Sequence, residues 1–195
     1  MTTAALILAG GNATRIGFGD DLLPEVGGSP LLSRSITARR PDTPATAISA
    51  NGDPARFTAY GLAVLPDGAF AGQGPLAGVL AGLDRAAATG AELLPTVQGD
   101  TPLVPAGLAA PPPACASSNS RTHHLVAFWP TACRDALRAL LAASGSRAIA
   151  RFTGAIGMRR VAFPTGKWDP FLNVNTPDDL AIARSVMRRT EEGLP

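Results

Sequence analysis

The stretch LILAGGNATRIG, residues 6–17, decides how the rest of this chain is interpreted. Its first four residues are apolar and predict a buried strand, and Gly10 and Gly11 follow at once. Paired glycines after a strand let backbone N–H groups approach an anion closely, because no Cβ stands in the way. Arg15 adds a permanent positive charge within reach. The stretch predicts either a nucleotide phosphate loop at the end of a first strand or a plain strand-to-helix turn, and the motif alone does not separate these.

The composition predicts one packed domain. The chain has 195 residues, of which 46% are hydrophobic and only 5% aromatic. That length supports a single good core, and the apolar content excludes a disordered chain. We therefore expect a single domain that spans residues 1–195.

Charge and sulfur content exclude several classes of protein. Seventeen basic and fifteen acidic residues give a formal net charge of +2, too small and too scattered to predict a nucleic-acid surface. Cys115 and Cys133 show neither a disulfide framework nor metal-ligand spacing. No apolar run is long enough to cross a membrane, and no charged region precedes the first apolar run. We expect a cytoplasmic protein without a nucleic-acid or membrane partner.

Apolar runs and turn residues predict alternating strands and helices, which is typical of an α/β fold. Expected strands lie at 4–9, 45–50, 61–65, 93–98, 125–128 and 158–163, with one more near Ala114. Expected helices begin at Ser29-Pro30, 55, 75, 131, 147 and 177. The stretches 12–28 and 106–124 are expected to be dominated by loops.

Two carboxylates follow predicted strands directly. Asp67 comes after the strand at 61–65, and Asp100 after the strand at 93–98. In α/β folds the carboxyl ends of parallel strands carry ligand-binding groups, and an Asp beside a triphosphate is a usual ligand of Mg²⁺. Each Asp can instead serve its own turn, and for Asp67 the turn is the stronger local interpretation.

The last helix has a clear start signal. Thr176, Pro177 and Asp179 form a capping box with proline at the first helical position. Asn173 and Asn175 lie just before it, where they either bind a ligand or satisfy the turn. Further upstream, His123-His124 has no partner at zinc-ligand spacing.

Four segments in this order and spacing resemble one family. They are LAGG at 8–11 with Arg15 and Gly17, GPLAG at 74–78, GDTP at 99–102 and FLNVNTP at 171–177. Together they are similar to the molybdenum cofactor guanylyltransferases, the MobA-like branch of the nucleotidyltransferases. The related cytidylyl branch usually has LAAG in the first segment, so Gly11 favours the guanylyl branch.

The resemblance implies a single-domain, three-layer α/β sandwich with a mostly parallel, Rossmann-like sheet of the nucleotide-diphospho-sugar-transferase type. It implies Mg²⁺-dependent transfer of GMP from GTP to the terminal phosphate of molybdopterin, with release of pyrophosphate. The implied partners are GTP, molybdopterin and, transiently, the enzymes that deliver or accept the molybdenum cofactor. Positioning and neutralisation of phosphate charge would supply most of the catalysis.

The resemblance also assigns roles to individual residues. Asp100 is expected to bind Mg²⁺ and nucleotide and, with Arg15, to act in catalysis. Asn173 and Asn175 are expected on the molybdopterin side. The remaining nucleotide-binding residues are expected to be Leu8, Ala9, Gly10, Gly11, Asn51 and Asp67.

The chain departs from the family pattern at several positions. Asp20-Asp21 stands where the family has Asp-Lys, Ser49 where it tends to have Asn, and His123-His124 where His-Pro is usual. Ile16 in place of Met and Gly99 in place of Cys are milder changes. Three hypotheses follow: a guanylyltransferase in which Arg15 or Lys167 compensates, a catalytically impaired nucleotide- or cofactor-binding protein, or a related nucleotidyltransferase that uses CTP or a sugar-phosphate acceptor.

Overall fold

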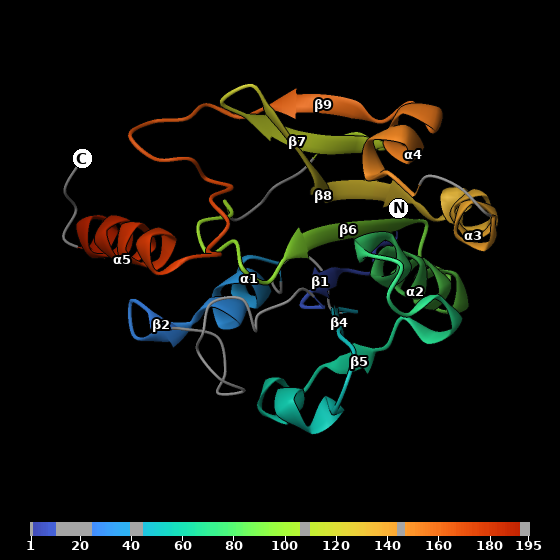
Figure 1. The fold of residues 1–195 in the computed structure, drawn as a ribbon, viewed down its shortest axis with the longest axis horizontal. Helices are drawn as coiled ribbons and strands as arrows, with labels where there is room; N and C mark the ends of the chain where they lie inside the picture. The colour runs from blue at the N-terminus through green and yellow to red at the C-terminus, as the bar shows by residue number, and fades with distance from the viewer. Residues whose placement is uncertain (1, 11–24, 40–44, 106–109, 144–146, 192–195) are drawn as a thin grey trace.

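A computed structural model describes residues 2–10, 25–39, 45–105, 110–143 and 147–191 of the chain. The expectations for Gly11, Arg15, Ile16 and Asp20-Asp21 fall outside these ranges. The described part has the α/β architecture expected from the sequence (Figure 1).

A seven-stranded sheet in the order β5-β4-β1-β6-β8-β7-β9 organises the described residues. Every neighbouring pair is parallel except the two that involve β8, so the predicted mostly parallel sheet is confirmed. The strands are β1 (Leu6–Leu8), β4 (Ala47–Ser49), β5 (Ala63–Leu65), β6 (Leu93–Gln98), β7 (Ala114–Ser118), β8 (Arg121–Pro130) and β9 (Arg159–Ala162).

Helices cover both faces of this sheet, which gives the three layers (Figure 1). Successive residues of β1 point to opposite faces: Leu6 packs in one core with α2, α3 and α4, and Ile7 in another with α1. A smaller core joins α5 to α1 and to a short hairpin. The helices are α1 (Leu31–Arg39), α2 (Pro75–Ala88), α3 (Arg134–Ala142), α4 (Ile149–Ala155) and α5 (Pro177–Glu191), with 3₁₀ turns η3 (Pro54–Tyr60), η4 (Gly68–Phe70) and η5 (Thr131–Cys133).

Helix α2 packs closely on the sheet because it carries two glycines on its buried face. A Cβ added to Gly78 would lie 2.3 Å from the Oγ of Ser49, and one added to Gly82 would lie 2.7 Å from Leu6. Both distances are shorter than real Cβ contacts, so a larger residue at either position would have to displace Ser49 or Leu6. The first turns of α2 consequently lie over the ends of β1 and β4.

The expected helix start at Ser29-Pro30 is wrong. These residues form strand β3, which pairs with β2 (Glu25–Val26), and α1 begins at Leu31. Gly27 and Gly28 both have positive φ, 55° and 65°, which is the backbone of a tight two-residue hairpin turn. The Arg34 side chain then holds the hairpin by donating to the carbonyls of Val26 and Gly27.

The expected loop at 106–124 is also partly wrong. Residues 114–118 and 121–130 pair as the antiparallel hairpin β7–β8, so His123 and His124 lie in a strand. Asn119 and Ser120 turn the chain with positive φ of 45° and 61°. Both strands consist mainly of polar residues near this turn. The sequence there therefore lacks the alternation of apolar and polar residues that predicts a strand.

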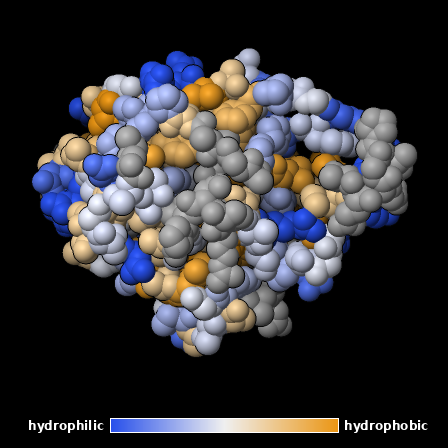
Figure 2. Space-filling view, turned by 180° about the vertical axis from the view of Figure 1, so that it is seen from behind, coloured by the Kyte–Doolittle hydropathy of each residue, from blue (hydrophilic) through white to orange (hydrophobic). Residues whose placement is uncertain are grey.

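The surface of the described residues exposes few large apolar side chains. Figure 2 shows apolar residues in separate patches among hydrophilic ones, and Ile182 is the one large apolar side chain that counts as exposed among those described. In the same ranges, no helix combines the length and the apolar character that a bilayer crossing requires.

Candidate functional site

Four parallel strands end together and bring most of the predicted residues to one edge of the sheet. Beyond β1, the Ala9 N–H donates to the Ser49 carbonyl at 2.8 Å, and the Gly99 N–H donates to the Leu8 carbonyl at 2.9 Å. The Ala50 N–H likewise donates to the Leu65 carbonyl at 3.1 Å. Because these bonds continue the parallel ladder, the turns after β1, β4, β5 and β6 lie side by side. We call this region the carboxyl edge.

Asn51 and Asp67 form a reciprocal pair at the carboxyl edge. The Asn51 Nδ2 donates to Asp67 Oδ2 at 2.7 Å, and the Asp67 backbone N–H donates to Asn51 Oδ1 at 3.0 Å. Asp67 precedes η4, but its carboxylate makes no hydrogen bond to that turn. The turn interpretation of Asp67 is therefore wrong, and the pair places an oriented carboxylate beside the ends of β4 and β5.

The backbone at Gly10 is open. Gly10 is exposed, and a Cβ added there would meet only ordinary contacts, the nearest 3.7 Å away at the Ser49 carbonyl. Packing within the described residues therefore does not require glycine here. Ser49, in contrast, is 2% exposed and packs under α2 against Gly78. Its side chain serves the helix–sheet contact and does not face the carboxyl edge.

Asp100 follows β6 in a turn that several residues hold. The Ser35 hydroxyl on α1 donates to the Gln98 carbonyl at 3.0 Å, and the Val174 N–H donates to the Asp100 carbonyl at 2.9 Å. Burial raises the pKa of Asp100, while hydrogen bonds from its own backbone and from Thr101 act in the opposite direction. A carboxylate that is costly to ionise in the free protein is suited to a site that a cation completes.

Asn173 reaches the same turn from the far end of the sequence. The Thr101 hydroxyl lies 3.0 Å from Asn173 Oδ1 and 3.4 Å from Asp100 Oδ1, so its one proton is shared between the amide and the carboxylate oxygen. Two expected site residues, Asp100 and Asn173, thus meet through one buried threonine. Asn175 lies two residues further on, where its backbone N–H donates to Asp179 in the capping turn of α5 and the residue is exposed.

The capping box at the start of α5 is confirmed. Thr176 Oγ1 accepts from the Asp179 N–H at 3.1 Å, and Asp179 Oδ2 accepts from the Thr176 N–H at 2.9 Å. The capping box therefore holds the end of the segment 171–175 at the first turn of α5.

A second polar cluster at the carboxyl edge was not predicted. The Ser118 hydroxyl lies 2.8 Å from Asp169 Oδ1 and 2.7 Å from His123 Nε2. Asp169 also accepts from the Phe171 N–H at 2.9 Å, and the rings of His123 and Phe171 lie 4.9 Å apart. Ser118 and His123 share the β7–β8 hairpin, but Asp169 follows Ser118 by 51 residues, so no local sequence signal marks the cluster. This cluster, which we call the clamp, fastens the segment before Asn173 to the β7–β8 hairpin.

The oxygen atoms around Asp100 fit Mg²⁺. Among the described residues no three His, Cys, Asp or Glu side chains gather into a metal cluster. Asp100 offers one carboxylate, with the oxygens of Thr101 and Asn173 beside it. Mg²⁺ favours such sites, in which one or two carboxylates and substrate phosphates share the coordination with water.

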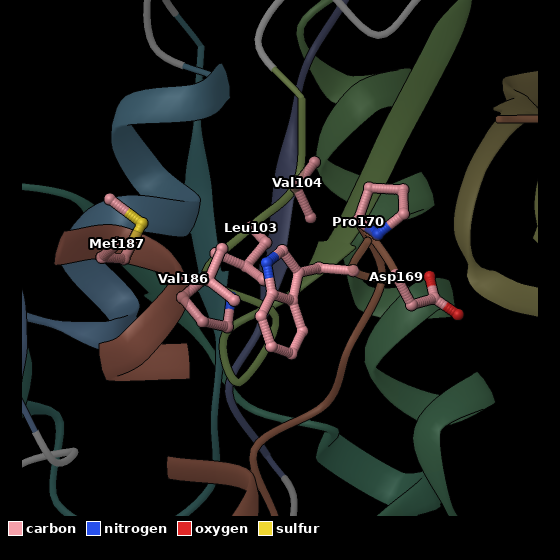
Figure 3. A pocket seen from close by; sticks show the side chains of 8 residues that line it. Leu103, Val104, Asp169, Pro170, Val186 and Met187 are labelled. Carbon is pink, nitrogen blue, oxygen red and sulfur yellow. The ribbon is translucent and has the colours of Figure 1, made fainter. Parts of the chain in front are cut away.

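A cavity lies next to this turn, between the residues after Asp100 and helix α5 (Figure 3). Its volume is about 360 Å³. It is lined by Pro102, Leu103, Val104, Trp168, Asp169, Pro170, Val186 and Met187.

Comparison with known proteins places the chain among nucleotidyltransferases. The MobA-like NTP transferase domain family matches residues 5–158. A molybdenum cofactor guanylyltransferase from Acidiphilium cryptum (strain JF-5) is 47% identical over 184 residues, which cover 93% of each chain. One from Rhodobacter capsulatus is 46% identical, over 97% of this chain and 98% of its own.

Solved structures show the same fold at lower identity. Molybdopterin-guanine dinucleotide biosynthesis protein A from Archaeoglobus fulgidus superposes with a TM-score of 0.69 at 20% identity, over 96% of this chain and all of its own. The 2-C-methyl-D-erythritol 4-phosphate cytidylyltransferase from Thermus thermophilus gives 0.63 at 19% identity, with the same coverage. The sheet and its flanking layers are thus shared by proteins that differ widely in sequence.

Proposed function

Because the chain belongs to the MobA-like NTP transferase family and, within it, to the molybdenum cofactor guanylyltransferases, we propose that its carboxyl edge transfers GMP from GTP to molybdopterin. An oxygen of the acceptor's terminal phosphate attacks the α-phosphorus of GTP and forms a new P–O bond. The bond from the α-phosphorus to the bridging oxygen breaks, and pyrophosphate leaves with its electron pair. The observation that carries the proposal is the meeting of Asp100 and Asn173 through Thr101, beside the open backbone of Gly10.

GTP is assigned to the side of the edge formed by β1, β4 and β5. The exposed backbone at Gly10 leaves room for a phosphate or a base to approach the chain closely. The Asn51–Asp67 pair offers a fixed carboxylate for a hydroxyl or amino group of the nucleoside. Gly11 and Arg15, which follow Gly10 in the sequence, are proposed to contribute to binding of the phosphates.

Asp100 is proposed to hold Mg²⁺, which supplies charge neutralisation on the phosphates when bound. With its Oδ1 engaged by Thr101, Asn173 keeps its Nδ2 group to donate to a phosphate oxygen. Both residues then act by positioning and by stabilising negative charge, and no side chain has to act as a base, because the attacking phosphate is already an anion.

The departures from the family pattern are of unequal weight. Ser49 packs against Gly78 and so gives no support to an impaired protein. Asp21 puts negative charge where a cation is expected, and it defines the critical test. Calorimetry with Mg²⁺-GTP should show binding by the wild type; binding that appears only in Asp21→Lys would contradict the proposal and favour the impaired alternative.

The activity assay uses purified protein, Mg²⁺, molybdopterin and GTP, with pyrophosphate release and the dinucleotide product measured together. CTP is the competitor. Product from GTP in preference to CTP supports the proposal, and a preference for CTP would favour the cytidylyl alternative.

A further inference from the structure

The cavity beside α5 lies next to the proposed reaction centre. Pro102, which lines it, follows Asp100 by two residues, so their Cα atoms lie within about 7 Å of each other. On its other side the cavity is bounded by 168–170, which runs on to Asn173. The same two segments therefore form both the cavity wall and the Asp100–Asn173 contact.

Trp168 is the aromatic residue of this wall, and it differs from the other tryptophan. Trp129 is fully buried, and its indole N–H donates to Thr96 Oγ1 at 2.9 Å. Trp168 is partly exposed, and among the described residues its indole N–H has no acceptor. A partly exposed indole beside an apolar cavity offers a stacking surface for a planar ring.

The clamp holds this surface in place. Asp169 follows Trp168 directly and is fixed by Ser118 and by the Phe171 N–H. Figure 3 shows the Asp169 carboxylate directed away from Leu103, Val186 and Met187 on the opposite wall. The carboxylate therefore anchors the segment without placing negative charge among the apolar residues of the cavity.

A lysine lies next to Trp168. Lys167 is the only lysine in the 195 residues, and its Nζ lies 5.9 Å from the centre of the Trp168 ring. The side chain is exposed, so it can move to an anion near the cavity. An aromatic surface and an ammonium group side by side fit a ligand that joins a planar ring system to a phosphate.

We propose that this cavity is the acceptor subsite, in which Trp168 stacks on the fused pterin rings and Lys167 pairs with the phosphate that they carry. The inference rests on the proposed function for the identity of the acceptor. It adds the residues that recognise it, because none of the four family segments includes Lys167 or Trp168.

Binding of two probes tests the subsite without catalysis. The probes are a pterin that carries a phosphate monoester and the dephosphorylated form of the same pterin. Each is titrated into the protein, and binding is measured by tryptophan fluorescence and by calorimetry. Trp168→Ala should weaken both probes about 10-fold, since stacking on an aromatic side chain contributes on this scale. Trp168→Phe should recover most of the affinity. Lys167→Gln should weaken only the phosphorylated probe.

The kinetic readout separates this subsite from general damage. In Trp168→Ala the KM for molybdopterin should rise about 10-fold while the KM for GTP stays at the wild-type value. Arg56→Ala, which removes a cation 5.6 Å from the ring of Phe57 on η3, is the matched control and should change neither KM.

Unchanged binding of both probes in Trp168→Ala would overturn the subsite, whatever the activity of the enzyme. A wild type that binds the pterins through Trp168 but transfers no GMP would support the subsite and overturn the proposed function. If Lys167→Gln lost the same affinity for both probes, the proposal that Lys167 pairs with the phosphate would be overturned.

Discussion

The two sides of the carboxyl edge are built in different ways. On the side of β1, β4 and β5, strand register alone sets the positions, and the side chains that face outward are the exposed Asn51–Asp67 pair. On the side of β7 and β8, the clamp ties a long returning segment to the sheet through buried and half-buried side chains. The first side is a backbone platform, and the second is a network whose members depend on one another.

This difference predicts how each side responds to mutation. A change on the backbone platform should affect one ligand and leave the fold intact, because the ladder that positions it remains. A change in the clamp should affect stability and geometry together, since one residue satisfies several groups. Asp100 lies where the two sides meet and should matter most.

Asp100→Asn should therefore have the largest effect on activity. Loss of the carboxylate removes the proposed Mg²⁺ ligand, worth about 3–4 kcal/mol of transition-state stabilisation, or roughly two to three orders of magnitude in rate. Steady-state rates of pyrophosphate release measure this. The free energy of unfolding at neutral pH should not fall, because burial disfavours the charged form of Asp100. A variant with near wild-type rates would remove Asp100 from the reaction.

Asp169→Ala should have the next largest effect, and it should act on both stability and activity. It leaves the Phe171 N–H without an acceptor and removes the carboxylate partner of the buried Ser118 hydroxyl, at a cost of about 1–3 kcal/mol in the free energy of unfolding. Urea denaturation measures the change. The matched control is Asp169→Asn, which keeps an amide oxygen for both donors and should lose much less. Equal losses in the two variants would show that the hydrogen bonds do not hold the segment.

Asn51→Ala should leave stability unchanged and weaken GTP binding. The exposed pair with Asp67 contributes on the order of 1 kcal/mol to orienting the carboxylate, so the KM for GTP should rise about fivefold. The KM for molybdopterin should stay constant. If both KM values rise together, the backbone platform and the clamp are coupled, and the contrast between them fails.

The smallest effect should appear in the dependence of stability on pH. Burial lowers the pKa of His123; Arg121 and His124 act in the same direction, and Asp169 opposes them. Below pH 6.5 this histidine is protonated in the unfolded chain but still neutral in the folded protein. The free energy of unfolding therefore falls as the pH drops from 6.5 through the lowered pKa of the folded protein. Urea midpoints between pH 7 and 5 measure this slope.

His123→Gln should reduce that slope. His124 has a pKa that burial and Arg160 lower in the same way, so His124→Gln should remove a separate part of it. A slope that His123→Gln leaves intact would show that the clamp does not respond to protonation.

The parts of the fold that the sequence predicted depend on local chemistry. The strand 93–98, the helix from Pro75 and the capping box at Thr176 were predicted correctly, because neighbouring residues alone determine them. The predicted parallel strands also implied that their carboxyl ends meet at one edge of the sheet. Asp67 and Asp100 were correctly predicted to lie at strand ends on that edge.

What the sequence missed is non-local. The β2–β3 hairpin depends on the positive φ of Gly27 and Gly28. The sequence pattern around these glycines predicts a loop and does not predict the pairing of the two short strands. The polar strand around His123 is stabilised by Ser118 and by Phe171 from a distant segment. Asp169 looked like an ordinary residue before a proline, because its partners are brought to it only by the folded sheet.

The central place of β1 has a consequence for synthesis on the ribosome. Leu6 pairs on one side with Ala47 and on the other with Thr96, so the first strand made stays incomplete until β6 has emerged. At about 5–20 residues per second, roughly 5–20 s pass while its apolar residues wait for that partner. The nascent chain therefore exposes an unpaired apolar strand for longer than any later one, and chaperones that bind such strands should find their target in residues 4–9.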